Sequence, residues 1–204
     1  MNMSYEPARE VFGLFRERII KDVEIASQLQ SAVIMLRSSY NTAIRENRFI
    51  VGGAVEHIIV GALNGVRLPA VHVGVGDTRI DLRVQGPKAP AGFSTKASFS
   101  SFNVRLVNTL GESVAVWNEP TLFLFKKVGI VYSDPELLPN ATKSSKDALL
   151  LDGKAMKGFI SAHPEYVISM DFEHPHGSKI ASSKTASEDV ARAIVKNFPR
   201  LLLP

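Results

Sequence analysis

Residues 79–99 read RIDLRVQGPKAPAGFSTKASF, and this stretch decides the fold class. Apolar and polar residues alternate over 79–84 and again over 93–99, a pattern typical of half-buried strands. The glycine and proline residues of 85–92 indicate a connecting loop. We therefore expect two neighbouring strands that belong to one sheet.

Further strands are expected on both sides of this pair. Residues 71–75 alternate in the same way. The segments 121–125 (TLFLF) and 128–132 (VGIVY) are almost wholly apolar, which favours strands that are buried on both faces. Residues 166–172 are a candidate for a last strand. The sheet is thus expected to extend well beyond the first two strands.

Helices are expected before and after the strands. Apolar residues recur at three- and four-residue steps over 6–36, which predicts a long helical region. Shorter helices are expected at 40–47, 54–64, 147–162 and 187–198, the last with a capped start. Residues 102–110 fit either a helix or another strand, and a helix is favoured. A turn or close-approach segment is expected at 48–53, where two glycines adjoin. The order of elements predicts an α/β (α+β) domain with a central mixed β-sheet flanked by helices.

The size and composition of the chain restrict the class of protein. With 204 residues and 45% hydrophobic content, we expect one domain over 1–204, with an N-terminal helical region (1–50), a core (51–132) and a C-terminal region (133–204). The absence of cysteine excludes disulfides, thiolate nucleophiles and cysteine-ligated zinc. No apolar stretch has membrane-spanning length and the first ten residues are too polar for a signal peptide, so a soluble cytoplasmic protein is expected. The net charge of +4 permits nucleic-acid binding without requiring it.

Asp81 and Lys96 are the candidate catalytic pair. Side chains alternate across a strand, so Ser94 and Lys96 project from the same face of the second strand. If the two strands pair, Asp81 and Lys96 meet at one edge of the sheet. A carboxylate suits Mg²⁺, and a lysine suits the attacking water or the charge that develops on a phosphate. The pair therefore favours metal-dependent phosphodiester hydrolysis.

An Asp on one strand, a short loop and a (D/E)-X-K tripeptide on the next resemble the PD-(D/E)XK nuclease superfamily, especially type II restriction endonucleases. The likeness covers about residues 50–132. Two positions depart from the family pattern: Ile80 precedes Asp81 where Pro is common, and Ser94 occupies the position of an acid. The resemblance implies a restriction endonuclease-like fold, Mg²⁺ as cofactor, double-stranded DNA as substrate and a homodimer for a palindromic target.

Glu56 is the candidate for the missing acid. One branch of restriction endonucleases is similar in carrying Ser in the tripeptide and supplying the carboxylate from elsewhere. Here a Gly-rich segment and a helix precede the sheet, in the sequence VGGAVEHIIV of 51–60. Apolar helical neighbours would make Glu56 costly to bury without a cation or a hydrogen-bond partner. The resemblance thus implies that Asp81 and Glu56 hold Mg²⁺, that Lys96 positions water and that Ser94 lies adjacent.

Other interpretations of these residues stay open. Asp81 is also compatible with a salt bridge to Arg79 or Arg83, and Lys96 with a solvated lysine at a sheet edge. Glu56 is also compatible with a pair to Arg48. Two further features favour ordinary surface structure: Glu112 adjoins a glycine in an expected turn, and the pair His174 and His176 lies in a polar segment without a known metal motif.

Two lysine-rich segments, 140–146 and 177–185, suit phosphate contacts and short hydrogen bonds to bases. Each is equally compatible with a solvated loop. The candidate DNA-binding residues are Lys143, Lys146, Lys179 and Lys184, and the long N-terminal helix is a candidate dimer or DNA-clamp element.

Taken together, the sequence predicts a sequence-specific, Mg²⁺-dependent endodeoxyribonuclease of the restriction type. The alternatives are a DNA-binding protein without catalysis and a repair or recombination nuclease of the same fold.

Overall fold

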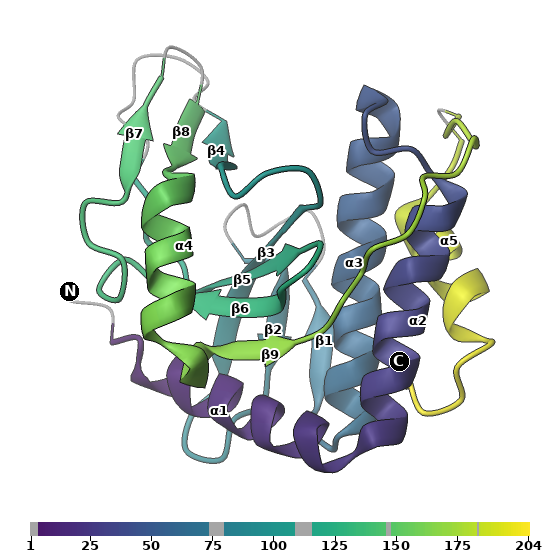
Figure 1. Ribbon diagram of the computed structural model, residues 1–204. Helices are drawn as coiled ribbons and strands as arrows, with labels where there is room; N and C mark the ends of the chain where they lie inside the picture. Colours follow the sequence, from purple (N-terminus) through teal and green to yellow (C-terminus); the bar gives the residue numbers. More distant parts are fainter. Residues whose placement is uncertain (1–3, 74–79, 109–115, 146–147, 183) are drawn as a thin grey trace.

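The computed structural model describes residues 4–73, 80–108, 116–145, 148–182 and 184–204. Within them, a mixed sheet of six strands forms the centre of the molecule (Figure 1). Strands β3 and β5 run parallel, and the other neighbours are antiparallel. The order is β1 (Ala70–His72), β2 (Leu82–Val84), β3 (Ala91–Ser98), β5 (Thr121–Phe125), β6 (Gly129–Ser133) and β9 (Val167–Ser169). The predicted mixed sheet flanked by helices is confirmed.

The centre of this sheet is buried on both faces. Successive side chains of a strand point in opposite directions, so Leu122 and Leu124 join one hydrophobic cluster while Phe123 and Phe125 join the other. All five residues of β5 and all five of β6 are buried. The two predicted central strands are therefore confirmed, with β6 one residue further along the chain than expected.

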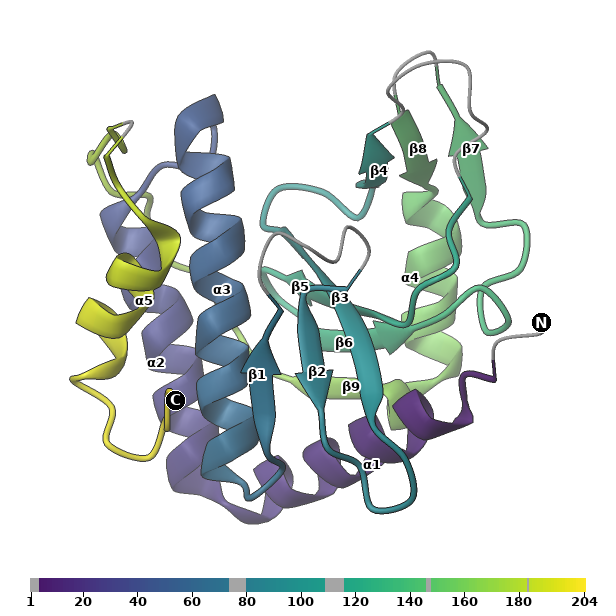
Figure 2. The same cartoon turned by 180° about the vertical axis from the view of Figure 1, so that it is seen from behind.

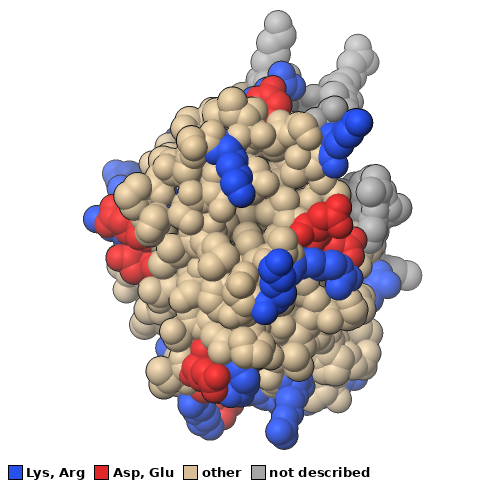
Figure 3. All heavy atoms as spheres, turned by 90° about the vertical axis from the view of Figure 1, so that its right-hand side faces the viewer, with Lys and Arg blue, Asp and Glu red and all other residues tan. Residues whose placement is uncertain are grey.

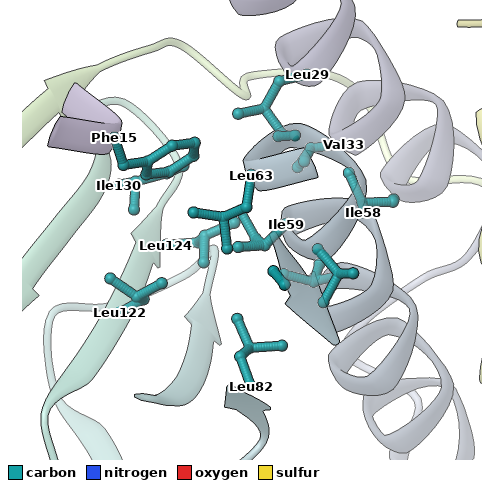
Figure 4. Close-up of a cluster of buried hydrophobic side chains, with 14 of the residues drawn as sticks. Phe15, Leu29, Val33, Ile58, Ile59, Leu63, Leu82, Leu122, Leu124 and Ile130 are labelled. Atoms are coloured by element: carbon teal, nitrogen blue, oxygen red, sulfur yellow. The ribbon is translucent and has the colours of Figure 1, made fainter. Parts of the chain in front are cut away.

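Three helices cover the first face: α1 (Glu6–Lys21), α2 (Val23–Ser39) and α3 (Arg45–Gly65). Figure 4 shows side chains of all three, among them Phe15, Leu29 and Leu63, packed toward the leucines of β2 and β5. The predicted single helical region of 6–36 is two helices. Asp22 separates them, because its side chain accepts a hydrogen bond from Ile25 N and caps α2.

The prediction of a short helix at 40–47 followed by a turn at 48–53 is wrong, because α3 runs through both glycines. A close approach does occur at Gly53, however. A Cβ on Gly53 would lie 2.6 Å from Ser187 Oγ of α5 (Ser187–Val195), which packs against α3. Burial of the surrounding apolar residues outweighs the poor helix propensity of the glycine pair.

The second face of β5, β6 and β9 is covered by helix α4 (Gly153–Ala162) and a three-stranded sheet. That sheet has the order β4 (Val104–Asn108), β8 (Ala148–Leu151) and β7 (Thr142–Ser144), and a 3-10 helix (Pro164–Tyr166) follows α4. The helix predicted over 102–110 is thus wrong, since Val104 and Leu106 bury alternate side chains. The helix predicted over 147–162 begins only at Gly153, where Asp152 caps it.

Two ends of predicted elements also differ. The strand expected over 166–172 is limited to β9, and the helix expected over 187–198 ends at Val195 and begins without a side-chain cap.

At the sheet edge, Asn64 hydrogen-bonds to both N and O of Ala70 in β1. This side chain takes the place of a neighbouring strand and so protects the edge.

Candidate active site

Asp81 lies where β2 separates from β3. The regular ladder between these strands ends at Leu82, which pairs with Phe93. Beyond it, Asp81 Oδ2 accepts hydrogen bonds from Thr95 N at 2.6 Å and from Ser94 Oγ at 3.1 Å. The carboxylate replaces the next rung of the ladder and is therefore held in the plane of the sheet, with a side chain 28% exposed.

Lys96 is brought to this carboxylate. Its Nζ lies 3.9 Å from Asp81 Oδ2, at the limit of an ion pair rather than at hydrogen-bond distance. The hairpin of β2 and β3 produces the meeting because Ser94 and Lys96 project from the same face of β3. Both charged groups are open to solvent and substrate, since the side chain of Lys96 is also 28% exposed.

Glu56 approaches from α3. Its Oε2 lies 2.9 Å from His72 Nε2, and its side chain is 18% exposed. Burial, followed by the negative charge of Asp81, raises the pKa of Glu56, while His72 and Lys96 oppose the rise. Glu56, Asp81 and Lys96 therefore belong to one electrostatic group at the same end of the sheet.

His72 is a member of this group that the sequence did not single out. It pairs in register with Leu82 of β2, the residue after Asp81. Its ring lies on the α3 side of β1, where it contacts Glu56. Its ring stacks on His57 of α3 at 4.2 Å. Burial and the proximity of His72 lower the pKa of His57. The alternation VHV at 71–73 gave no signal for this, because it favours buried valines and an outward His72, whereas Val71 is the exposed residue.

The structure discriminates among the other interpretations. Glu56 pairs with His72 rather than Arg48, whose guanidinium donates to the carbonyls of Thr42 and Ala43. Lys96 is not simply a solvated lysine at a sheet edge, because it pairs with Phe123 of β5 and its Nζ approaches Asp81. Arg79 and Glu112 lie outside the described residues. His174 and His176 are exposed, as expected for a surface segment.

The donor set for a metal is small. Across the described parts of the chain, His, Asp and Glu side chains form no group of three or more arranged to hold a metal ion. Two carboxylates whose charges interact, those of Glu56 and Asp81, are present. Any cation held there would need water or substrate oxygens to complete its coordination.

The candidate DNA-binding lysines lie on two separate parts of the molecule. Lys143 is in strand β7 rather than in a loop, and it pairs with Asp152. Lys179 and Lys184 are exposed on the segment that runs beside α3. The backbone of Lys179 forms an isolated parallel β-bridge with that of Tyr40. Lys146 lies outside the described residues. In Figures 1 and 2, β7 and this segment rise on opposite sides of the sheet end where β3 finishes.

The face with α2 and α5 has a different character. Figure 3 shows basic and acidic side chains in small groups there, with broad uncharged surface between them. Two of the ion pairs of these helices are Arg192 with Glu188 and Arg200 with Glu24. Because acids offset the basic groups, this face of α2 offers little support for a DNA clamp. The role of the N-terminal helical region as a dimer or DNA-clamp element stays a prediction.

No family model, curated protein or solved structure matches the chain. The described residues also contain no helix with the length and apolar character needed to cross a bilayer. The geometry of the site is therefore the basis for assigning a function.

Proposed function

We propose that the chain is a Mg²⁺-dependent endodeoxyribonuclease of the restriction type, with a restriction endonuclease-like fold. The observation that carries the proposal is the meeting of Asp81 with Lys96 at a strand end, where Glu56 joins them electrostatically. A carboxylate pair beside a lysine suits phosphodiester hydrolysis, which needs charge stabilisation at phosphate and an activated water.

The residues fit Mg²⁺ in their chemistry. This ion usually keeps several waters and takes one or two carboxylates together with substrate phosphate oxygens. Asp81 and Glu56 would hold it. Burial, followed by the negative charge of Asp81, raises the pKa of Glu56, and a nearby cation would oppose both effects. When bound, the ion supplies Lewis-acid polarisation of the phosphate and a lower pKa for a bound water.

Each side chain of the site then has a role. Thr95 N and Ser94 Oγ fix the carboxylate of Asp81, so Ser94 is a positioning residue in this scheme. His72 fixes Glu56 in the same way. Lys96 places a positive charge beside the scissile phosphate, where it orients the attacking water or stabilises developing negative charge.

Double-stranded DNA would bind over the end of the sheet where β3 finishes. Strand β7, which carries Lys143, and the segment that carries Lys179 rise on opposite sides of this end, so these lysines would contact phosphates. Symmetric cutting of a palindromic site would require two copies related by the DNA dyad, so the proposal includes a homodimer on DNA.

The decisive experiment is incubation of plasmid DNA with the protein in Mg²⁺ and in EDTA. Discrete fragments that appear only in Mg²⁺ would support a restriction enzyme. Ragged degradation would indicate a repair or recombination nuclease. No cleavage, with retained DNA binding, would reject catalysis and favour a DNA-binding protein.

Two variants test the residue roles. Asp81→Ala and Lys96→Ala should each lower cleavage by at least about 10²–10³-fold, the usual cost of one group that stabilises a transition state. Lys88→Ala is the matched control, because Lys88 is exposed in the hairpin loop at the other end of β2 and β3. An active Asp81→Ala protein would overturn the assignment. Glu56→Ala should lose cleavage and keep DNA binding.

A further inference from the structure

A cavity of about 490 Å³ lies between the beginning of α3 and the end of β3. The α3 side contributes Arg48 and Gly52, the β3 side contributes Ala97, Ser98 and Phe99, and His176 comes from the C-terminal segment. None of these residues has a role in the proposed chemistry.

The cavity adjoins the candidate active site along two elements. Gly52 precedes Glu56 by one helical turn, a distance of about 6 Å along the helix axis. Ala97 follows Lys96 in β3 and projects from the opposite face of the strand, where it packs against the hydrophobic cluster that includes α3. The cavity therefore adjoins the site on the side of Glu56, and a polymer that presents one phosphate at Asp81 and Glu56 would bring its neighbouring unit to the cavity.

The lining combines an apolar floor with a polar rim. Ala97, Val51 and Phe99 supply apolar surface. His176 and Arg48 supply hydrogen-bond donors, whereas the Ser98 hydroxyl already donates to the carbonyl of Ser101. Arg48 is held at the rim by its hydrogen bonds to the carbonyls of Thr42 and Ala43. A nucleotide has the matching composition, with a flat apolar base and an anionic phosphate.

A buried positive charge lies beneath the floor. The guanidinium of Arg37 lies 4.7 Å from the centre of the Phe99 ring and donates to the carbonyl of Phe172. The residue is 1% exposed, and within the described structure its Nε has no hydrogen-bond partner. A cation in such surroundings is weakly screened, so it adds positive potential that favours an anionic ligand.

We propose that this cavity holds the nucleotide next to the cleaved bond, with its phosphate at the rim of Arg48 and His176 and its base or sugar over the apolar floor. The inference rests on the proposed function and makes the cavity a substrate subsite of the same enzyme. Its ligand class is a deoxynucleotide within DNA.

The variant Gly52→Met tests the inference by filling the cavity. A Cβ on Gly52 meets nothing within 4 Å, and methionine favours a helix more than glycine does, so the fold should be kept. Gly158→Met is the matched control, because Gly158 is an exposed glycine of α4 that also has open space around its Cβ. Arg48→Gln removes the charge of the rim without filling the space.

Two measurements are made on wild type and on the three variants. The first is a calorimetric titration with thymidine that carries a phosphate on each sugar hydroxyl. The second is plasmid cleavage in Mg²⁺. Arg48→Gln should weaken nucleotide binding and slow cleavage by about tenfold, the effect of losing one charge-assisted hydrogen bond. Gly52→Met should weaken both by at least as much, because its side chain occupies the space of the ligand. Wild type and Gly158→Met should behave alike.

The outcomes separate the two proposals. If wild type cuts DNA and Gly52→Met cuts equally well, the subsite is rejected and the nuclease is kept. If the thymidine bisphosphate binds wild type and Gly52→Met equally, the subsite is likewise rejected. If the nucleotide binds only where Gly52 is present and no variant or wild type cuts DNA, the nuclease proposal fails and the cavity stands as a nucleotide site alone.

Discussion

The carboxylate of Asp134 and the carboxylates of Glu56 and Asp81 lie in the same fold under opposite conditions. Asp134 is fully buried at the end of β6. Arg9 of α1 donates to it from Nε and Nη2, both at 2.9 Å, and the Tyr132 hydroxyl donates at 2.8 Å. Burial alone would raise the pKa of Asp134, yet hydrogen bonds from Arg9, Tyr132 and the backbone lower it.

Glu56 has fewer partners. His72 is its hydrogen-bond partner at 2.9 Å, and the second carboxylate, Asp81, adds negative charge nearby. Burial and Asp81 therefore raise the pKa of Glu56. The fold thus stabilises the charged form of Asp134, whereas burial and a second carboxylate disfavour the charged form of Glu56. A carboxylate of the second kind is a candidate for a functional site.

The largest expected effect is on stability at Asp134. Asp134→Ala should lower the free energy of unfolding by about 3–5 kcal/mol, because it leaves the guanidinium of Arg9 without its buried partner. Urea denaturation measures this. Asp81→Ala is the comparison and should cost about 1–2 kcal/mol, because it leaves Thr95 N unpaired at a site that is partly open to water. Equal losses for the two variants would break the comparison.

The next effect concerns divalent cations. Mg²⁺ at ten times its dissociation constant should stabilise wild type by about 1.4 kcal/mol, as binding to the folded state alone requires. Asp81→Asn should abolish this gain, because it removes a carboxylate of the pair. The gain is measured by urea denaturation with and without Mg²⁺. An identical gain in Asp81→Asn would show that the cation binds elsewhere.

The smallest effect is the pH dependence of stability. A raised carboxyl pKa means that folding disfavours the charged form of Glu56. Its contribution to the free energy of unfolding is therefore present below the ordinary pKa of 4.5 and is lost as the pH rises through the raised pKa. Glu56→Gln should therefore be more stable than wild type above that window, by less than about 1 kcal/mol.

The pH dependence of stability that Asp134 causes has the opposite sign. Because folding lowers its pKa, its contribution to the free energy of unfolding is present above the ordinary pKa of 3.8 and is lost as the pH falls through the lowered pKa. Urea denaturation of wild type and Glu56→Gln between about pH 3 and pH 8 measures both effects, since Glu56 titrates above 4.5 and Asp134 below 3.8. A Glu56→Gln protein that loses stability toward neutral pH would contradict the assignment of Glu56.

The sequence predicted part of the site well because that part is local. Alternation over 79–99 places Asp81 on one strand and Ser94 with Lys96 on the next, and the short loop between them leaves little choice of pairing. The sequence failed at 102–110, because FNVRLVNTL fits both a helix and a strand until Leu149 and Leu151 bury it as β4. It also failed at 48–53, where α3 continues through both glycines and Gly53 packs closely against Ser187 of α5.

The mixed sheet, the buried strands β5 and β6 and the proximity of Asp81 to Lys96 follow from the amino-acid sequence. The reason is that the alternation of side chains along a strand and the length of a connection depend on neighbouring residues alone. Only the tertiary structure decided that Glu56 meets His72 and feels the charge of Asp81. That arrangement depends on how α3 packs against β1 and α5. Such packing is set by burial over the whole chain, and no local pattern encodes it.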